Sequence, residues 1–433
     1  MKNNISDLRT FLLLWITQAF STLGSSMTNF ALVVWSYKAE GSALTTALLS
    51  VSSYAPYVVM SVFAGALSDR WNKKKVMLAS DTFAAFCTVT ILALMKSNSL
   101  EIWYLYIVNA LNGLMNTFQQ PAADVAVSLL TPEKYYQKAG GLRAFSYSVN
   151  SFLAPVFAAA LMSWAGTYAV IMFDLFTFSV AFITLMFFIK IPDRKLDINE
   201  KETIIKSAGA GIKYLKHNRG ILDLILFLAA INFTASVFNA ALPALLLNGR
   251  GGGDSAYGYV NAVSGMAMLI GSIIVTIMPE PKSRIKVICN TLLLAMSTEN
   301  FILAFGRNTA VWCIGAAVAW TGIPIMNANM DVVLRSRIPL KMQGRVYAAR
   351  NSLQFFTIPL GYIAGGFLVD KVFEPFMAGR TEASVMTVLF GSGKGSGAAF
   401  LFMILGILGV VTCIIFRNDR HIWNLEKTNI KWK

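Results

Sequence analysis

Polar side chains recur at spacings of three, four or seven residues inside four long apolar stretches of this sequence. The sets are Gln18, Ser21, Ser25 and Thr28; Asn109, Asn112, Asn116 and Gln119; Asn232, Ser236 and Asn239; and Trp320, Asn327 and Asp331. This spacing places each set on one face of a helix. Such faces could hydrogen-bond a small molecule in a cavity, or they could join neighbouring helices.

Three carboxylic acids also fall inside apolar stretches. They are Asp81, Asp174 and Glu299. A charged side chain at mid-bilayer costs about 2.5–3.5 kcal/mol on insertion scales, so a buried acid needs a reason. We predict Asp174 and Glu299 as proton carriers, with a hydrogen-bonded packing role as the alternative, and Asp81 as structural. Both histidines lie in polar segments, so no histidine relay is expected.

The elements that position these side chains are twelve apolar stretches, each long enough to cross a bilayer. Seven are plainest: Leu12–Val34, Leu44–Leu67, Trp103–Ala126, Ile171–Ile189, Ile221–Leu247, Trp312–Val333 and Ala398–Phe416. About 20 apolar residues in a helix span the hydrocarbon layer. The 433 residues are 56% hydrophobic and 14% charged. The expected fold is an all-α integral membrane protein with twelve transmembrane helices, and a separate soluble catalytic domain is excluded.

The net charge of +15 is a topology signal and does not indicate a nucleic-acid partner. If the spans alternate from a cytoplasmic N-terminus, 30 of the 37 Lys and Arg residues fall in cytoplasmic segments and 7 in outer loops. This bias is the positive-inside rule. Both termini are therefore expected in the cytoplasm, and the cell (plasma) membrane is the expected location.

The stretches divide into two groups of six around a basic interval. The predicted domains are an N-terminal six-helix bundle (1–189), a cytoplasmic linker (190–219), a C-terminal six-helix bundle (220–416) and a cytoplasmic tail (417–433). Two proline pairs have nearly equal spacing: Pro121 and Pro155 are 34 residues apart, and Pro324 and Pro359 are 35 apart. Kinks in register indicate duplication, so we expect two pseudo-symmetric bundles.

Two polar segments are candidates for short helices. The linker could form an amphipathic helix on the membrane surface, with Ile204, Ile205, Ile212 and Leu215 on its apolar side. The outer segment Asp370–Gly395 could hold a short interfacial helix near Ala383–Phe390, or be an ordinary loop insertion.

Several kinds of chemistry are excluded by missing motifs. The chain has no G-x-x-x-x-G-K-[ST] sequence, which excludes ATP-driven transport within this chain. No paired-histidine metal motif or nucleophile elbow is visible, so we expect neither a metal site nor an enzyme. All four cysteines lie in apolar stretches, which argues against a disulfide framework.

The loop after the second apolar stretch carries the most specific motif. It reads GALSDRWNKKK from Gly65 to Lys75. This resembles the major facilitator superfamily signature G-x-L-x-D-R-x-x-[RK]-[RK]. The resemblance implies a conformational latch that stabilises the outward-open state. Its residues would be Gly65, Asp69, Arg70, Lys73 and Lys74, with Asp124 as the partner of Arg70.

Shorter phrases resemble one branch of that superfamily, the macrolide and enterobactin exporters. They are Gln119-Gln-Pro121-Ala, Pro132-Glu-Lys, Phe173-Asp174 with Thr177-Phe178, and Gly344-Arg345-Val346. This resemblance implies proton-driven export of amphipathic compounds. Drug/proton antiporters often carry an Arg in helix four, where this chain has Asn112, and a Gly-Pro in helix five, where it has Ala154-Pro155. Proton coupling by that usual route is therefore in doubt.

The expectation is a monomeric exporter working by alternating access, powered by the proton gradient without a cofactor. Predicted substrate contacts are Gln18, Asn29, Asn112, Gln119, Asn232, Asn239, Trp320 and Asn327, and predicted proton carriers are Asp174 and Glu299. The expected partners are a small-molecule substrate and membrane lipid. Two alternatives remain open: a proton-coupled nutrient importer, and a transport-inactive receptor or scaffold whose basic linker docks on anionic lipid.

Overall fold

In the computed structural model, the described residues are 9–131, 136–192, 212–248, 252–339, 346, 349–351, 353–381 and 384–427. For 61–70, 128, 136–141, 143, 144 and 335 only the backbone is described. The first helices are α2 (Arg9–Glu40), α3 (Ala43–Arg70), α4 (Lys73–Lys96), α5 (Ile102–Leu130), α6 (Tyr136–Ile183) and η2 (Thr184–Phe188). The later helices are α8 (Arg219–Leu247), α9 (Asp254–Ile277), α10 (Arg284–Phe305), α11 (Thr309–Arg337), α13 (Thr357–Phe367), η3 (Leu368–Phe373), α14 (Glu374–Ala378), α15 (Val385–Phe390), α16 (Ser396–Arg417) and α17 (Arg420–Lys427).

The seven plainest apolar stretches all lie on helical backbone, apart from the final residue of Ile171–Ile189. One long helix, α6, contains two of the predicted spans. Its backbone breaks at Gly166, where φ is 77° and ψ is 175°. Because side chains rarely adopt a positive φ, glycine is the residue suited to this break.

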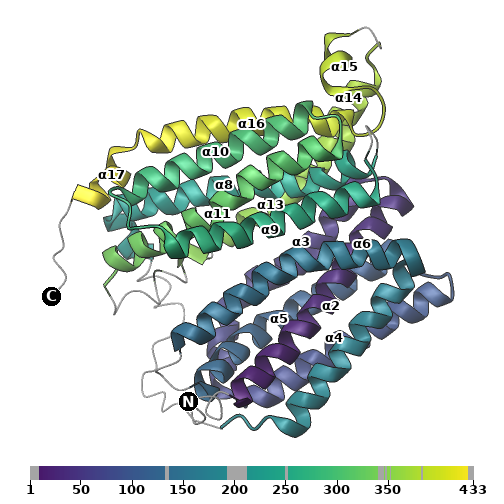
Figure 1. The fold of residues 1–433 in the computed structure, drawn as a ribbon, viewed down its shortest axis with the longest axis vertical. Helices are drawn as coiled ribbons and strands as arrows, with labels where there is room; N and C mark the ends of the chain where they lie inside the picture. Colours follow the sequence, from purple (N-terminus) through teal and green to yellow (C-terminus); the bar gives the residue numbers. More distant parts are fainter. Residues whose placement is uncertain are drawn as a thin grey trace. The chain divides into compact units, whose positions relative to one another are not determined.

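The chain forms two compact units, each a bundle of helices (Figure 1). One unit comprises Met1–Ala39 and Ser52–Lys201, and the other Glu40–Val51 and Glu202–Lys433. The first turns of α3 thus belong to the unit that holds the C-terminal helices. The domain boundaries predicted from sequence remain predictions.

Local sequence explains where several helices begin. Asn72, Ser283 and Asn308 each accept a backbone N–H three residues ahead, which caps α4, α10 and α11. The predicted proline pairs lie inside helices: Pro121 in α5, Pro155 in α6, Pro324 in α11 and Pro359 in α13.

Helices of the C-terminal unit pack closely because small residues stand at their crossings. A Cβ on Gly365 of α13 would lie 2.8 Å from the Ala240 Cβ and from the Val237 carbonyl oxygen of α8. A Cβ on Gly409 of α16 would lie 2.8 Å from the Met296 Cβ of α10. In membrane bundles such close approach supplies much of the packing energy.

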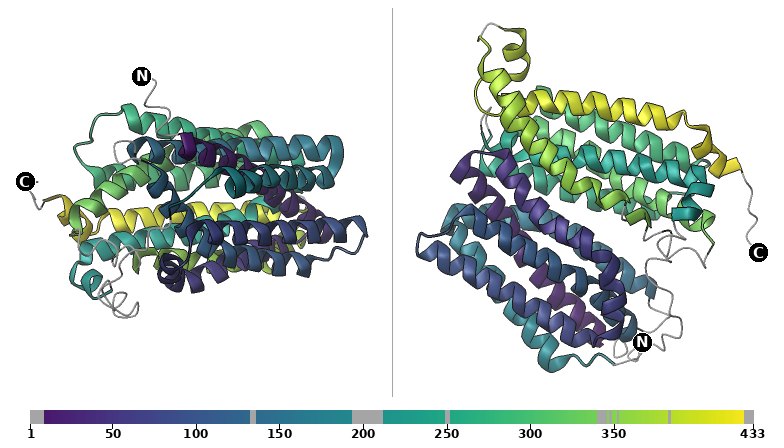
Figure 2. Two further views of the ribbon diagram at one scale, coloured as in Figure 1. Left: turned by 90° about the horizontal axis from the view of Figure 1, so that it is seen from below. Right: turned by 180° about the vertical axis from the view of Figure 1, so that it is seen from behind.

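The last helix, α17, closes one end of this unit, as the view from behind shows (Figure 2). Glu426 accepts hydrogen bonds from the Ser283 hydroxyl at 2.7 Å and the Ile285 backbone N–H at 2.8 Å. Its carboxylate therefore caps α10, where the helix dipole favours negative charge. Residues 212–217 of the linker are helical, with Leu215 buried and Ile212 exposed. The predicted contacts Ile204 and Ile205 lie outside the described residues.

Between α13 and α16 the chain forms a short helical excursion beyond the bundle end (Figure 1). It contains η3, α14 and the short helix α15, which lies within the region considered for an interfacial helix. Glu374 accepts from the backbone N–H groups of Gly395 at 3.0 Å and Ala398 at 3.2 Å. This carboxylate caps the start of α16.

Among the described residues, nine helices are long and apolar enough to cross a membrane. One of them, Phe145–Phe188, contains the break at Gly166. The chain is thus a multi-pass membrane protein with an all-helical fold. The count of twelve spans and the cytoplasmic position of both ends remain predictions.

Replacing Gly365 with Ala should push α13 away from α8. Because overpacking costs about 1–3 kcal/mol, we expect a lower thermal unfolding midpoint for the purified protein in detergent. The matched control is Gly379→Ala, since a Cβ at Gly379 would have no neighbour closer than 3.8 Å. Equal midpoints for the two variants would contradict the close packing of α13 on α8.

Candidate functional site

The first buried carboxylate of the candidate site is Asp81 on α4. Gln119 on α5 donates through Nε2 to Asp81 Oδ1 at 2.5 Å. Gln18 of α2 lies beside the same carboxyl group. Within the described part of the chain, Gln18 Nε2 and Asp81 Oδ2 are buried without a hydrogen-bond partner. The structure thus brings together two predicted substrate residues, and their common neighbour is an acid.

The second carboxylate, Asp174, joins α6 to α2. The side chain is 4% exposed and accepts from the Ser25 hydroxyl at 3.0 Å. Thr28, one turn further along α2, also lies beside it. A Cβ on Gly24 would lie 2.9 Å from Asp174 Cα, so the two helices approach closely at this point. The predicted proton carrier therefore contacts the polar face of α2.

The third carboxylate, Glu299 on α10, contacts a predicted substrate residue. The side chain is 7% exposed, and Trp320 on α11 donates its indole N–H to Oε1 at 2.9 Å. A Cβ on Gly315 would lie 2.9 Å from Ile302 Cγ2, which places α11 directly against this part of α10. A carboxyl group beside a neutral indole donor can bind and release a proton. The protonation state of Glu299 would change the acceptor that the Trp320 indole N–H meets.

Among the described residues, no hydrogen bond joins the side chains of the other predicted substrate residues to one another. Asn29 and Asn327 are exposed, whereas Asn112, Asn232 and Asn239 are half-buried. Asn112 Oδ1 is a buried acceptor without a partner among the described residues. It stands in the middle of the polar face of α5 and is available to a donor from a ligand.

The predicted latch is described only in part. Gly65, Asp69 and Arg70 lie on the backbone of α3, but their side chains are outside the described residues. Lys73 is buried and donates to the Trp71 carbonyl at 3.1 Å. Asp124 is exposed on α5. Its pairing with Arg70 remains a prediction, because the Arg70 side chain lies outside the described residues.

Lys74, the other lysine of the motif, contacts the end of a neighbouring helix. Its ammonium donates to the carbonyls of Met186 at 2.9 Å and Ile189 at 2.8 Å. A cation beside unpaired carbonyls is favourable at a helix C-terminus. Lys74 therefore caps the segment that follows α6.

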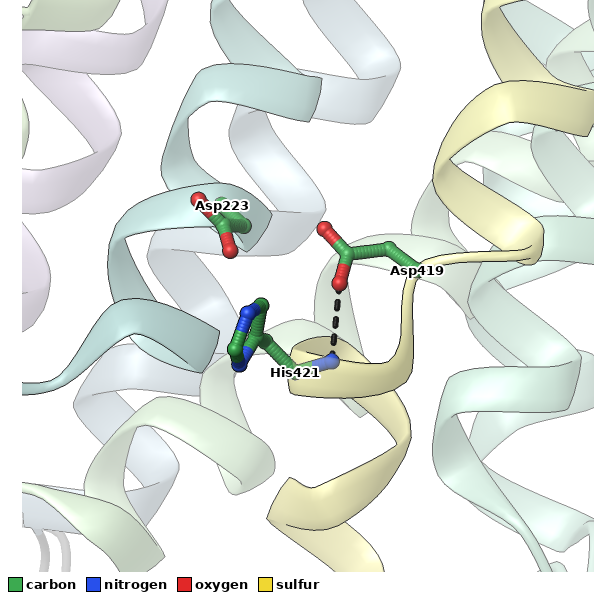
Figure 3. A group of neighbouring side chains, drawn as sticks. All are labelled: Asp223, Asp419 and His421. Atoms are coloured by element: carbon green, nitrogen blue, oxygen red, sulfur yellow. Dashed lines mark hydrogen bonds between the residues drawn. The ribbon is translucent and has the colours of Figure 1, made fainter.

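A polar cluster outside these sites consists of Asp223 on α8 with Asp419 and His421 at the start of α17 (Figure 3). Their candidate ligand atoms lie within 4.8 Å of one another. Asp419 Oδ1 accepts the His421 backbone N–H at 2.8 Å and caps α17. Arg219 also interacts electrostatically with Asp223. This neighbouring cation favours a structural role at the junction of α8 and α17 over metal binding.

Sequence periodicity found the polar faces but not the acid that each face contacts. The sequence predicts a structural role for Asp81 and names no partner, and the structure places its carboxyl group beside Gln18 and Gln119. The signal that could have pointed to this pairing is a buried acid on one helix opposite amides on two others.

Comparison with family models identifies the family of this chain. Residues 14–362 match the family model described as Major Facilitator Superfamily. The chain belongs to the Major Facilitator Superfamily. It is accordingly a transporter and not an enzyme.

Curated relatives from this superfamily align over most of the chain. Macrolide efflux protein A of Streptococcus pyogenes is 24% identical over 370 residues, which cover 84% of this chain and 90% of the relative. Macrolide efflux protein A of Enterococcus faecalis is 24% identical over 329 residues, covering 74% and 99%.

Solved structures of other transporters share the fold. A mutant of the nucleoside transporter NupG superposes with a TM-score of 0.70 at 13% identity, covering 94% of this chain and 99% of that one. A bacterial homologue of the iron transporter ferroportin in an inward-facing state gives a TM-score of 0.67 at 15% identity, covering 95% and 99%. Both are less than 25% identical to this chain, so their likeness concerns the fold alone.

Gln119→Leu should destabilise the N-terminal bundle because it leaves a buried carboxylate without its donor. The expected cost is about 1–3 kcal/mol, seen as a lower unfolding midpoint in detergent. Gln120→Leu is the matched control, because Gln120 is the next residue on α5 and is exposed. A Gln119 variant as stable as the control would show that the bond to Asp81 contributes nothing.

Proposed function

We propose that this transporter exports amphipathic small molecules by alternating access, with proton antiport as the energy source. The observation that carries the proposal is the contact between Glu299 and Trp320, in which a buried acid meets a large aromatic side chain. Glu299, which can bind a proton, is thereby in direct contact with Trp320, whose aromatic ring suits the apolar part of a ligand. Proton binding and substrate binding can influence each other through this one hydrogen bond.

The second acid supports coupling in the other bundle. Asp174 contacts Ser25 and lies beside Thr28 on the polar face of α2. That face also carries Gln18 and, one residue beyond Thr28, Asn29. A change in the protonation of Asp174 would alter which hydrogen bonds this face can offer.

The substrate class rests on composition and on the relatives. The predicted substrate residues other than Trp320 carry uncharged amide side chains, and the large aromatic side chain of Trp320 contacts Glu299. Neutral hydrogen-bonding groups among aromatic rings suit an amphipathic molecule better than a highly charged one. The relatives named macrolide efflux protein A favour export of a macrolide-like compound. The chain would work as a monomer in the cell membrane, without a cofactor.

Glu299→Gln should remove the part of efflux that a protonophore inhibits, because the amide cannot exchange a proton. Efflux of a fluorescent amphipathic cation and of a labelled macrolide is measured from expressing cells with and without the protonophore. The control is Glu101→Gln, since exposed Glu101 also accepts an indole N–H, from Trp103 at 2.6 Å.

Loss of efflux in the Glu299 variant with normal efflux in the Glu101 variant supports the assignment. Unchanged protonophore-sensitive efflux in the Glu299 variant overturns the proton role of this acid. Accumulation of the labelled compound, in place of exclusion, would favour the importer.

A further inference from the structure

The short helix α15 has an exposed apolar face at one end of the C-terminal unit (Figure 1). Val385, Val388 and Leu389 are 73%, 57% and 43% exposed. They are spaced by three and four positions and therefore share one side of the helix, which we call the apolar face of α15. A contiguous exposed apolar surface commonly marks contact with another protein or with a membrane.

The other side of α15 is fixed to the bundle by aromatic contacts. Phe390, which is 1% exposed, stacks on Phe305 of α10 with ring centroids 5.6 Å apart. It also packs against Phe400 of α16 with centroids 5.1 Å apart. Phe400 in turn stacks on Phe376 of α14 at 5.8 Å. Because one side of α15 is packed in this way, its apolar face stays directed away from the bundle.

These contacts place α15 at the level where two membrane-spanning helices end. Helix α10 ends at Phe305 and helix α16 begins at Ser396, and each contains 22 residues. A helix of this length is about 33 Å long, close to the roughly 30 Å thickness of the hydrocarbon layer. Since α15 packs on the last residue of α10 and the first two turns of α16, it lies at the boundary between hydrocarbon and lipid head groups.

Small residues allow the segment between α13 and α16 to lie directly on α16. A Cβ on Gly397 would overlap the Glu374 backbone nitrogen. Ser396, Ala398 and Ala399 beside it are all buried. This segment therefore covers the first turn of α16, and its own outward side takes the place of that turn at the surface of the unit.

Two arginines stand beside α15. Arg307, two residues beyond the end of α10, donates to the Val388 carbonyl oxygen. Arg380, between α14 and α15, lies over the Phe376 ring, 4.4 Å from its centroid. Both arginines are exposed, and guanidinium groups bind phosphate oxygens well. An apolar helix face flanked by cationic residues is typical of a helix that lies in a membrane interface.

The described part of this segment, 371–381 and 384–395, exposes only positive charge. Its exposed charged residues are Lys371, Arg380 and Lys394. Its described acid, Glu374, is directed inward and caps α16. Positive charge at a membrane surface favours anionic lipid.

We propose that α15 is a membrane anchor whose partner is a bilayer containing anionic phospholipid. The apolar face of α15 inserts at the level of the lipid head groups, and Arg307 and Arg380 bind lipid phosphates. The anchor holds the ends of α10 and α16 at the bilayer surface. It is independent of the cargo, because it uses none of the predicted substrate residues.

The test measures the depth of Val388 in nanodiscs made of phosphatidylcholine and phosphatidylglycerol. A spin label is attached at Val388→Cys in a variant without native cysteines. Its collisions with oxygen, which concentrates in lipid, are compared with its collisions with a water-soluble nickel chelate. The references are labels at Leu408→Cys, exposed in the middle of α16, and at Glu280→Cys, whose native side chain is 90% exposed. We expect an oxygen-to-nickel ratio at Val388 several-fold above that at Glu280 and below that at Leu408.

Arg380→Gln should lower this ratio at Val388, because the guanidinium that binds lipid phosphate is lost. The matched control is Arg420→Gln, which removes an exposed arginine beyond the opposite end of α16. The anchor is supported if the label at Val388 is accessible from lipid and only the Arg380 variant lowers the ratio.

A ratio at Val388 equal to that at Glu280 overturns the anchor and leaves the apolar face to a water-soluble partner. Few collisions with either reagent, together with spin–spin broadening between labels on different molecules, overturn it in favour of a second copy of this chain. Equal ratios in the Arg380 variant and the parent overturn the role of Arg380 in phosphate binding.

Discussion

Helices that cross a membrane must satisfy their polar side chains inside the protein. Many hydroxyl and amide groups donate to carbonyls of their own helix, as Thr117 does to Gly113, whereas three carboxyl groups pair with donors on neighbouring helices. Asp81 joins α4 to α5, Asp174 joins α6 to α2, and Glu299 joins α10 to α11. Each pairing couples two helices and leaves a group that can change its protonation. The same bonds therefore serve packing and are available for function.

Small residues make these pairings possible. Gly24 faces Asp174, where a Cβ would lie 3.1 Å from Oδ1, and Gly315 packs against the turn of α10 that holds Glu299. A larger side chain at either position would separate the helices and lengthen the hydrogen bond. The two glycines thus set how closely the helices approach at Asp174 and Glu299, and both hydrogen bonds depend on this close packing.

Carboxylates from other helices also cap helix ends. Glu426 caps α10, Glu374 caps α16 and Asp370 caps α3, each with a carboxylate from another helix. Glu426 and Glu374 each cap a helix that lies wholly within the C-terminal unit. Asp370 caps the first turn of α3, and this turn belongs to the same unit as Asp370.

Much of the architecture could be predicted from the sequence because apolar length and periodicity are local properties. The stretches Leu12–Val34 and Ile221–Leu247 lie within α2 and α8, and a short helix occurs at Val385–Phe390. Periodicity also identified the polar faces of α2 and α5. It could not identify their partners, because a face specifies a direction on one helix and says nothing about which neighbour stands opposite.

The contact of Asp370 with Ser42 is another pairing that sequence periodicity could not predict. The two residues lie in segments with no shared pattern, and only the folded chain brings them together. For the motif from Gly65 to Lys75, the sequence predicts a latch whose acidic and arginine side chains lie outside the described residues. The structure therefore adds the partners of buried acids, whereas the latch role of this motif remains a prediction.

We propose that substrate movement is coupled to proton movement in the opposite direction through buried carboxyl groups. The direct measurement uses purified protein in liposomes that contain a pH-sensitive dye, with a macrolide gradient and no other driving force. We predict that macrolide flow drives protons the opposite way, and that Glu299→Gln abolishes this proton flux. Proton flow in the same direction as the macrolide, or macrolide flux without proton movement, would contradict the account.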